Sequence, residues 1–181
     1  MTELPSFLCI ECRTNPLPLD WCEAWGEYRG RLARLLHALK FERHDFLDDA
    51  LASLLEETLR ARGDLAFDAI AAVPMTRARE RRRGYNQADL LGRALSARIG
   101  VPYGFSLLRR TPGVRATQST LPKRDRAANV RGAFVAEGVE GKAVLLVDDI
   151  CTTGETLRAC ATELRRAGAS RVCAITVAKA G

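Results

Sequence analysis

Two adjacent carboxylates, Asp148 and Asp149, follow a run of branched aliphatic residues and precede a short loop rich in threonine and glycine. The aliphatic run 143–147 is typical of a strand buried on both faces in a parallel sheet. The carboxylates then fall at the carboxyl end of that strand, where open α/β sheets bind their ligands. The loop 151–156 opens a helix, so its backbone N–H groups can bind an anion. Acceptors for sugar hydroxyls or a metal ion beside donors for a phosphate indicate a phosphorylated sugar as ligand.

Other phosphate-binding motifs fit this segment less well. A Walker A loop requires a lysine after its last glycine, whereas Gly154 is followed by Glu155. A dinucleotide fingerprint requires three glycines around the first turn, and this loop has one. A phospho-acceptor receiver domain also carries paired acids, but its chemistry needs no threonine and glycine cradle after them. The non-functional alternative is a strand that ends in a solvated turn, with Thr152 or Thr153 as a helix cap.

A second group of charged residues follows another predicted strand. The strand 68–73 stops at Pro74, which cannot donate to a sheet ladder. Five arginines lie within the next seven-residue stretch: Arg77, Arg79, Arg81, Arg82 and Arg83. Arginine suits bidentate phosphate contacts, so this run predicts a site for a polyanion, with a solvated helix face as the alternative.

The amino-terminal cysteines suggest a small metal-binding module. Cys9, Cys12 and Cys22 have the spacing of zinc-finger ligands, but Trp25 stands where a fourth cysteine is expected. Three nearby residues could supply the fourth ligand: Asp20, Glu23 and His37. The alternative is a decayed finger held by the packing of its two tryptophans, Trp21 and Trp25.

Composition restricts the class of protein. The 181 residues suffice for one α/β domain with a small appendage, and 47% of them are hydrophobic, which argues against disorder. The net charge of +6 comes from 24 arginines and four lysines, and it favours anionic partners such as diphosphates or nucleic acid. The sequence has no apolar run of about 18 residues, so no membrane span is predicted. The first residues lack signal-peptide character, so we expect a cytoplasmic protein whose cysteines are reduced or metal-bound.

Hydrophobic periodicity predicts the remaining elements. The pattern becomes helical from Gly26, and a second helix with Asp45 as a possible cap runs to Gly63. Further helices are predicted at 87–99, with Asn86 as cap, and at 155–167. Further strands are predicted at 103–108, 132–136 and 171–177, with a long basic loop over 109–131. Cys160 and Cys173 fall on apolar positions and are predicted to lie in the core. This alternation predicts an α/β fold with a doubly wound parallel sheet at 66–181. A cysteine-containing, zinc-finger-like module at 1–26 and a helical segment at 27–65 precede it.

The acid pair and the loop after it resemble the phosphoribosyl diphosphate (PRPP) loop of the type I phosphoribosyltransferases. The resemblance implies that Asp148 and Asp149 are the catalytic pair that holds the ribose 2′ and 3′ hydroxyls. It implies that the 5′-phosphate is held by Cys151, Thr152, Thr153, Gly154, Glu155 and Thr156. It also implies a diphosphate loop with Mg²⁺ as cofactor, formed by Val73, Pro74, Thr76, Arg77 and Arg79.

The order of motifs along nearly the whole chain resembles the ComF family, whose members are phosphoribosyltransferase-like. Its marks are Leu39-Lys40-Phe41, Val73-Pro74-Met75, Arg83-Gly84-Tyr85-Asn86-Gln87-Ala88, Thr117-Gln118, Arg126-Ala127-Ala128-Asn129-Val130 and Val147–Thr156, together with the amino-terminal cysteines. The resemblance implies a role in natural transformation, in which single-stranded DNA and competence-machinery proteins are partners. A lid over 109–129 would exclude water, and further anion contacts would come from Arg83, Asn86, Gln118, Arg126 and Asn129. Zn²⁺ would bind Cys9, Cys12 and Cys22.

Two functions are compatible with these residues. The first is pentosyl transfer from PRPP, in which catalysis consists mostly of positioning and stabilising the leaving diphosphate. The second is a non-catalytic role, in which a phosphoribosyltransferase scaffold binds single-stranded DNA or a protein partner through its arginines. The residues do not name an acceptor base.

Overall fold

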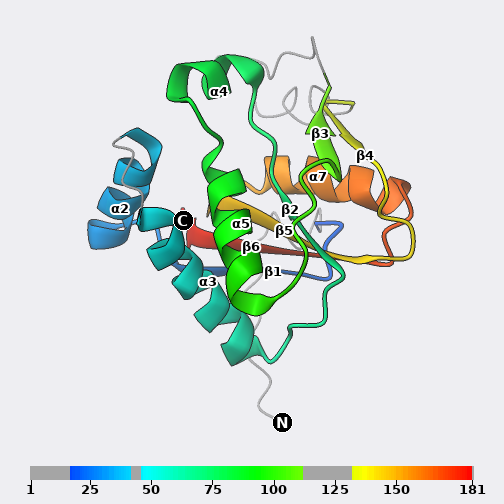
Figure 1. Ribbon diagram of the computed structural model, residues 1–181, viewed down its shortest axis with the longest axis horizontal. Helices are drawn as coiled ribbons and strands as arrows, with labels where there is room; N and C mark the ends of the chain where they lie inside the picture. Colours follow the sequence, from blue (N-terminus) through cyan, green and yellow to red (C-terminus); the bar gives the residue numbers. More distant parts are fainter. Residues whose placement is uncertain (1–16, 42–45, 112–131, 181) are drawn as a thin grey trace.

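A parallel sheet of four strands forms the centre of the protein. The computed structural model describes residues 17–41, 46–111 and 132–180. Among these, the strands lie in the order β1 (Trp21–Glu27), β6 (Arg171–Lys179), β5 (Ala143–Cys151) and β2 (Ala69–Ala72), and every neighbouring pair is parallel (Figure 1). The expected α/β fold with a parallel sheet is therefore confirmed.

The two central strands are buried on both faces. Residues 144–147 of β5 and residues 172–178 of β6 are buried, as are all four residues of β2. Each strand is a nearly continuous run of apolar residues, because helices cover both faces of the sheet and its central positions do not face water. Cys160 and Cys173 are buried in this core, as the sequence predicted.

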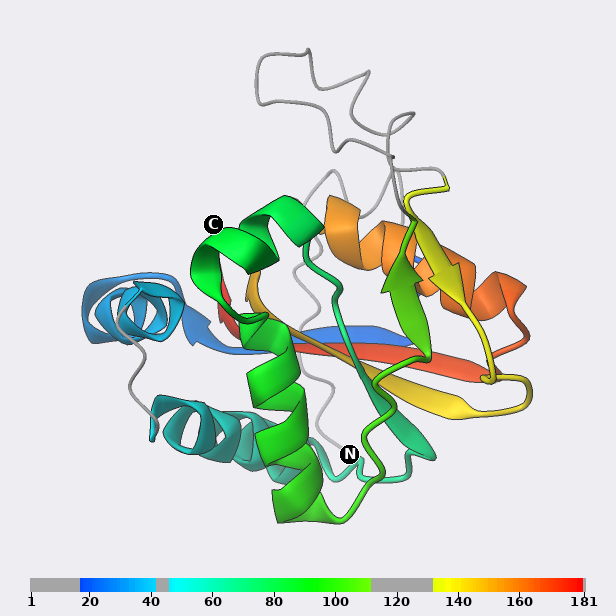
Figure 2. The same cartoon turned by 45° about the horizontal axis from the view of Figure 1, so that its top comes forward.

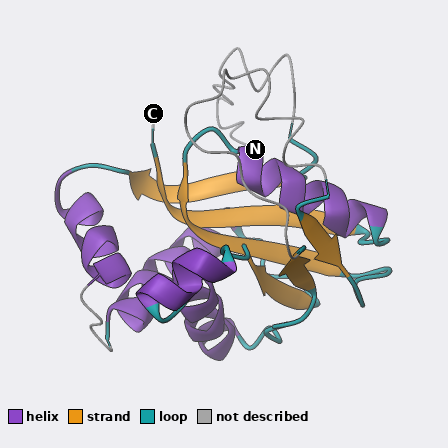
Figure 3. Cartoon of the chain, turned by 90° about the horizontal axis from the view of Figure 1, so that it is seen from above, coloured by secondary structure: helices purple, strands orange, loops and turns teal. Residues whose placement is uncertain are grey.

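Helices lie on both sides of the sheet. One face is covered by α3 (Leu47–Arg62) and α5 (Gln87–Ile99), with α2 (Gly30–Phe41) beside them, while α7 (Glu155–Arg166) covers the other face (Figure 3). A two-stranded antiparallel sheet of β3 (Leu108–Arg110) and β4 (Phe134–Ala136) lies beside α7, and the short helix α4 (Arg77–Arg83) lies at the end of α5 (Figure 2).

The core on the α5 face fixes the position of α2. Leu32, Leu36 and Leu39 of α2 are buried in one cluster with leucines of α3 and α5 and with Val147 of β5. Burying a leucine in such a core contributes about 2–5 kcal/mol relative to alanine. Because three leucines anchor α2, its last turn is held against the carboxyl end of the sheet.

The segment 21–27 differs from the sequence prediction. The sequence predicts the end of the cysteine module and the start of a helix here, but the segment forms β1, an edge strand of the main sheet. Its tryptophans pack against α3 and the chain that follows it: Trp21 lies edge-on to Phe67 with ring centroids 6.0 Å apart, and Trp25 donates from Nε1 to Glu57 at 3.1 Å. The strand is only half-buried, so its mixed polar and apolar residues lack the signature of a central strand.

Smaller differences concern the strands before and after the basic loop. The strand predicted at 103–108 is reduced to a single bridge between Tyr103 and Ile70, and pairing resumes only at 108–110. Arg109 and Arg110, which were assigned to the long loop, therefore belong to β3. The part of that loop at 112–131 and the proposed cap Asp45 lie outside the described residues. The helix at 155–166 and the strands at 134–136 and 171–179 agree with the prediction within two residues.

No helix within the described ranges is both long enough and apolar enough to cross a membrane.

The close contact between α5 and the bridge residue Tyr103 leaves no room for a larger residue at Gly92. A Cβ at Gly92 would lie 2.7 Å from Cε2 of Tyr103, so Gly92→Ala forces the ring to move. We expect a loss of about 1–3 kcal/mol in the free energy of unfolding, measured by urea denaturation, because the core around this ring is closely packed. In a Tyr103→Leu background the same substitution should cost less; an equal cost in both backgrounds would contradict the explanation.

Candidate functional site

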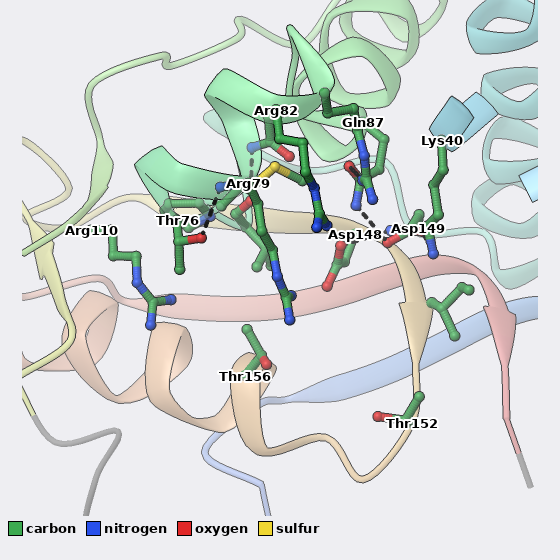
Figure 4. Close-up of a pocket in the computed structure, with 16 residues that line it drawn as sticks. Lys40, Thr76, Arg79, Arg82, Gln87, Arg110, Asp148, Asp149, Thr152 and Thr156 are labelled. Carbon is green, nitrogen blue, oxygen red and sulfur yellow. Dashed lines mark hydrogen bonds and ion pairs between the residues drawn. The ribbon is translucent and has the colours of Figure 1, made fainter. Parts of the chain in front are cut away.

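A cavity of about 500 Å³ lies at the carboxyl ends of β2 and β5. Its walls come from the chain after β2, from α4, from the start of α5, from the last turn of α2 and from the end of β5 (Figure 4). The chain leaves β2 toward α5 on one face of the sheet and leaves β5 toward α7 on the other face. Connections that diverge from two neighbouring parallel strands open a crevice between them, which is where such sheets bind ligands.

Side-chain caps hold the wall that follows β2. Asn86 is the N-cap of α5, where its Oδ1 accepts from the Ala88 N–H at 3.2 Å. Its Nδ2 also donates to the Val73 carbonyl at 3.0 Å, which ties the start of α5 to the end of β2. Thr76 caps α4 by accepting from the Arg79 N–H at 3.3 Å. These bonds fix the loop 73–76, so that Arg79 projects over the cavity (Figure 4).

The acid pair forms the opposite wall. Asp149 is only 5% exposed, and its Oδ2 lies 2.5 Å from Nζ of Lys40 on α2. Its Oδ1 accepts from Nε2 of Gln87 at 3.3 Å, and Gln87 in turn accepts from Arg83. Asp148 points into the cavity and accepts the Asp149 N–H at 2.8 Å (Figure 4). The two adjacent carboxylates therefore have different surroundings.

Burial gives Asp148 an unusual protonation behaviour. Removal from water and the neighbouring Asp149 carboxylate raise the pKa of Asp148 well above the ordinary value of 3.8, and Lys40 opposes this only in part. Asp148 consequently holds a proton to a higher pH than an exposed carboxyl does. The protonated form can donate a hydrogen bond, and the ionised form can accept one from a sugar hydroxyl.

Positive charge dominates the cavity. Among the described residues, the carboxyls of Asp148 and Asp149 line it together with five basic side chains: Lys40, Arg79, Arg82, Arg83 and Arg110. Burial lowers the pKa of Arg110, and repulsion from Arg79 lowers it further, although the nearby Cys160 opposes these effects. An anion between Arg79 and Arg110 would relieve that repulsion, so the geometry favours a multiply charged phosphate ligand.

The loop that joins β5 to α7 forms the floor of the cavity. Gly154 is the N-cap of α7 and has a φ of +74°, which favours glycine. A Cβ there would also meet Cδ2 of Leu17 at 3.4 Å. Hydrogen bonds from the Cys22 side chain and the Gly154 N–H lower the pKa of Cys151 to about 7, although burial opposes them. Thr152 of this loop and Thr156 in the first turn of α7 line the cavity (Figure 4).

The structure brings most of the predicted site residues together. Those that line the cavity are Val73, Pro74, Thr76, Arg79, Arg83, Asn86, Asp148, Asp149, Thr152 and Thr156. Five predicted residues do not line it: Arg77, Cys151, Thr153, Gly154 and Glu155. Gln118, Arg126 and Asn129 lie outside the described residues. The roles given to all of these residues stay predictions.

Among the described residues that line the cavity, four with polar or charged side chains were not predicted as site residues from the sequence. Arg82 was part of the arginine run, and Arg110 was placed in the basic loop. Lys40 and Gln87 appeared only as members of motifs that carried the family resemblance. Their chemistry depends on contacts between distant elements, so those motifs were the only signal that could have identified them.

The zinc site is not tested by the part of the chain that the structure describes. Within that part, no group of three or more histidine, cysteine and acidic side chains is placed to hold a metal ion. Cys22 packs against the core on the α7 face, while Cys9 and Cys12 lie outside the described residues. The ring of His37, one candidate for the fourth ligand, lies 4.7 Å from that of Phe41. Zinc binding therefore stays a prediction.

Comparison with known proteins gives the class to which this fold and site belong. The family of the phosphoribosyl transferase domain matches residues 82–181. A similar fold occurs in glutamine PRPP amidotransferase from B. subtilis, solved in complex with ADP and GMP, with a TM-score of 0.53 and 21% identity. That match covers 78% of this chain and 30% of the amidotransferase chain, and it shows the fold alone.

Proteins that are similar to this one over most of its length identify the family more specifically. DNA utilization protein YhgH of Salmonella typhi is 37% identical over 173 residues, which cover 93% of this chain and 76% of YhgH. Competence protein F of Haemophilus influenzae is 33% identical, with 91% and 75% covered, and competence protein ComFC of Streptococcus pneumoniae is 30% identical, with 94% and 74% covered. The chain belongs to the phosphoribosyltransferase-like ComF family.

The raised pKa of Asp148 predicts a pH-dependent effect on stability. As the pH rises above 3.8, the unfolded chain ionises this carboxyl while the folded chain resists, so the wild type loses stability until the pH passes the native pKa. Asp148→Asn removes this loss. The variant should unfold at higher denaturant than the wild type at pH 8, by about 1.4 kcal/mol for each unit of the raised pKa.

The difference between Asp148→Asn and wild type should vanish near pH 4. Glu140→Gln, which removes an exposed carboxyl, serves as the control and should show no such trend. If Asp148→Asn and the wild type were equally stable at both pH values, the pKa of Asp148 would not be raised in the folded protein.

Proposed function

We propose that the protein binds PRPP or a related ribose 5-phosphate and acts as a phosphoribosyltransferase-type pentosyltransferase. The observation that carries the proposal is the arrangement of the cavity, in which an acid pair faces several arginines across the carboxyl ends of two parallel strands. A ribose diphosphate carries hydroxyls for carboxyl groups and phosphates for arginines, so one ligand satisfies both walls.

Each wall has a distinct part in this proposal. Asp148 and Asp149 position the ribose hydroxyls, while Thr152, Thr156 and the N–H groups at the start of α7 hold the 5′-phosphate. Arg79 and Arg110 hold the diphosphate. When the bond between the anomeric carbon and the diphosphate oxygen breaks, the diphosphate leaves with the electron pair, and these arginines stabilise the charge that develops. The acceptor then bonds to the anomeric carbon and loses a proton.

The residues fit a directly bound Mg²⁺ poorly, although the family resemblance implies this cofactor. Mg²⁺ takes oxygen ligands and is usually held by one or two carboxylates in addition to phosphates and water. Both oxygens of Asp149 already have partners in Lys40 and Gln87, and Asp148 is biased toward its protonated form. If Mg²⁺ takes part, it would enter with the diphosphate.

A binding role in natural transformation is the second candidate. Its support is the outer face of α4, where Arg77 and Arg81 are exposed and do not line the cavity. Phe41, at 62% exposed, has the Arg83 guanidinium 5.3 Å from its ring centroid and offers a surface on which a base could stack. Relatives named for DNA utilization and competence favour single-stranded DNA or a competence protein as the partner. If the protein has this second function, we expect it to be located in the cytoplasm.

Calorimetric titration with PRPP tests the first candidate. Arg79→Met should weaken PRPP binding about tenfold or more, because it removes a charged hydrogen-bond donor from the cavity. Arg166→Met, a change on the exposed side of α7, is the matched control and should bind as the wild type does. Release of diphosphate when nucleobases are added would then show catalysis. Equal affinity of the Arg79 variant and the wild type would contradict the proposed diphosphate contact.

Salt-dependent binding of single-stranded DNA tests the second candidate. Replacement of Arg77 and Arg81 by serine should lower the slope of log affinity against log salt by about 1.4, since each single-strand phosphate contact contributes about 0.7. DNA binding should persist in an Asp148→Ala, Asp149→Ala double variant if it uses only the outer face. An unchanged slope in the arginine variant would exclude α4 as the DNA-binding surface.

A further inference from the structure

Lys40 belongs to a different layer of the molecule from the acid pair that it contacts. It lies in the last turn of α2, and the three buried leucines of that helix hold the turn beside the end of β5. Its side chain is 20% exposed, and Nζ lies 2.5 Å from Oδ2 of Asp149. Most of the side chain is buried, and the ion pair with Asp149 places its head group at the edge of the cavity.

The surroundings of Asp149 leave little room for another cation. Oδ2 faces Lys40, and Oδ1 accepts from Gln87, whose own oxygen accepts from Arg83. This chain of contacts fixes the carboxylate from both sides. A carboxylate oxygen is also the ligand that Mg²⁺ would need at this wall, and here an ammonium group already lies against it (Figure 4).

The ammonium group of Lys40 can contact a bound ligand and the Asp149 carboxylate at the same time. Lysine has three N–H donors, and the Lys40 head group both forms an ion pair with Asp149 and lines the cavity. The other donors can reach oxygens of a bound diphosphate or ribose. Together with Arg79 and Arg110, Lys40 surrounds the ligand position with fixed positive charge that requires no separate ion.

We propose that Lys40 supplies the positive charge that a divalent cation would otherwise supply beside the acid pair, so that the site takes a ribose diphosphate without needing Mg²⁺. This inference rests on the proposed function, because it concerns the same cavity. It predicts that the protein binds PRPP in the presence of a chelator, and that removal of the lysine charge creates a requirement for Mg²⁺.

The test is calorimetric titration of the whole chain with PRPP, once with EDTA and once with MgCl₂ at matched ionic strength. The wild type should show affinities that agree within about threefold, since matched salt leaves screening unchanged. Lys40→Met should bind PRPP about tenfold or more weakly in EDTA, because it removes a charged donor, and should regain much of that affinity with Mg²⁺. Lys40→Arg keeps the charge and should stay close to the wild type in EDTA.

The control is Lys142→Met, which removes a lysine charge from an exposed position before β5 and should leave both affinities unchanged. Wild-type protein that binds PRPP with Mg²⁺ but not with EDTA would overturn the inference and leave the proposed function standing. Wild-type protein that binds PRPP under neither condition would overturn the proposed function itself. If Lys40→Met does not fold, as judged by thermal unfolding, the wild-type comparison still decides.

Discussion

Placing two adjacent carboxyl groups at the end of a buried strand is the constraint around which this site is built. An isolated charge removed from water is costly unless it is paired or neutralised. The protein uses a different solution for each member of the pair. Asp149 is paired with Lys40 and hydrogen-bonded by Gln87, whereas burial biases Asp148 toward its neutral form. The cavity thus keeps two carboxyl groups for a ligand while remaining positively charged.

This solution makes the site depend on packing far from it. Lys40 reaches Asp149 only because Leu32, Leu36 and Leu39 anchor α2 in the same core as the leucines of α3 and α5. Gln87 reaches the same carboxylate because Asn86 starts α5 beside the end of β2. The helix α2, which as a sequence is a generic amphipathic segment, therefore lines the cavity and is also part of the core.

The sequence predicted the parts of this site that are local in the chain. The strand β5, the acid pair and the loop before α7 are contiguous, and the apolar run makes the strand unambiguous. The strand β1 was missed because an edge position leaves it half-buried, and the cysteine spacing favoured another interpretation. The role of Lys40 was missed because its partner lies in a distant part of the chain, and a lysine near the end of an amphipathic helix is typical of an exposed surface.

The distribution of arginines also bears on whether the two candidate functions exclude each other. Arg79 and Arg110 line a cavity of about 500 Å³ beside carboxyl groups, which can accept the hydroxyls of a ribose. Single-stranded DNA lacks the 2′-hydroxyl, so the acid pair offers it less than it offers a ribose phosphate. Arg77 and Arg81 are exposed and do not line the cavity. A polynucleotide and a sugar phosphate would therefore use different faces of α4, and one chain could bind both.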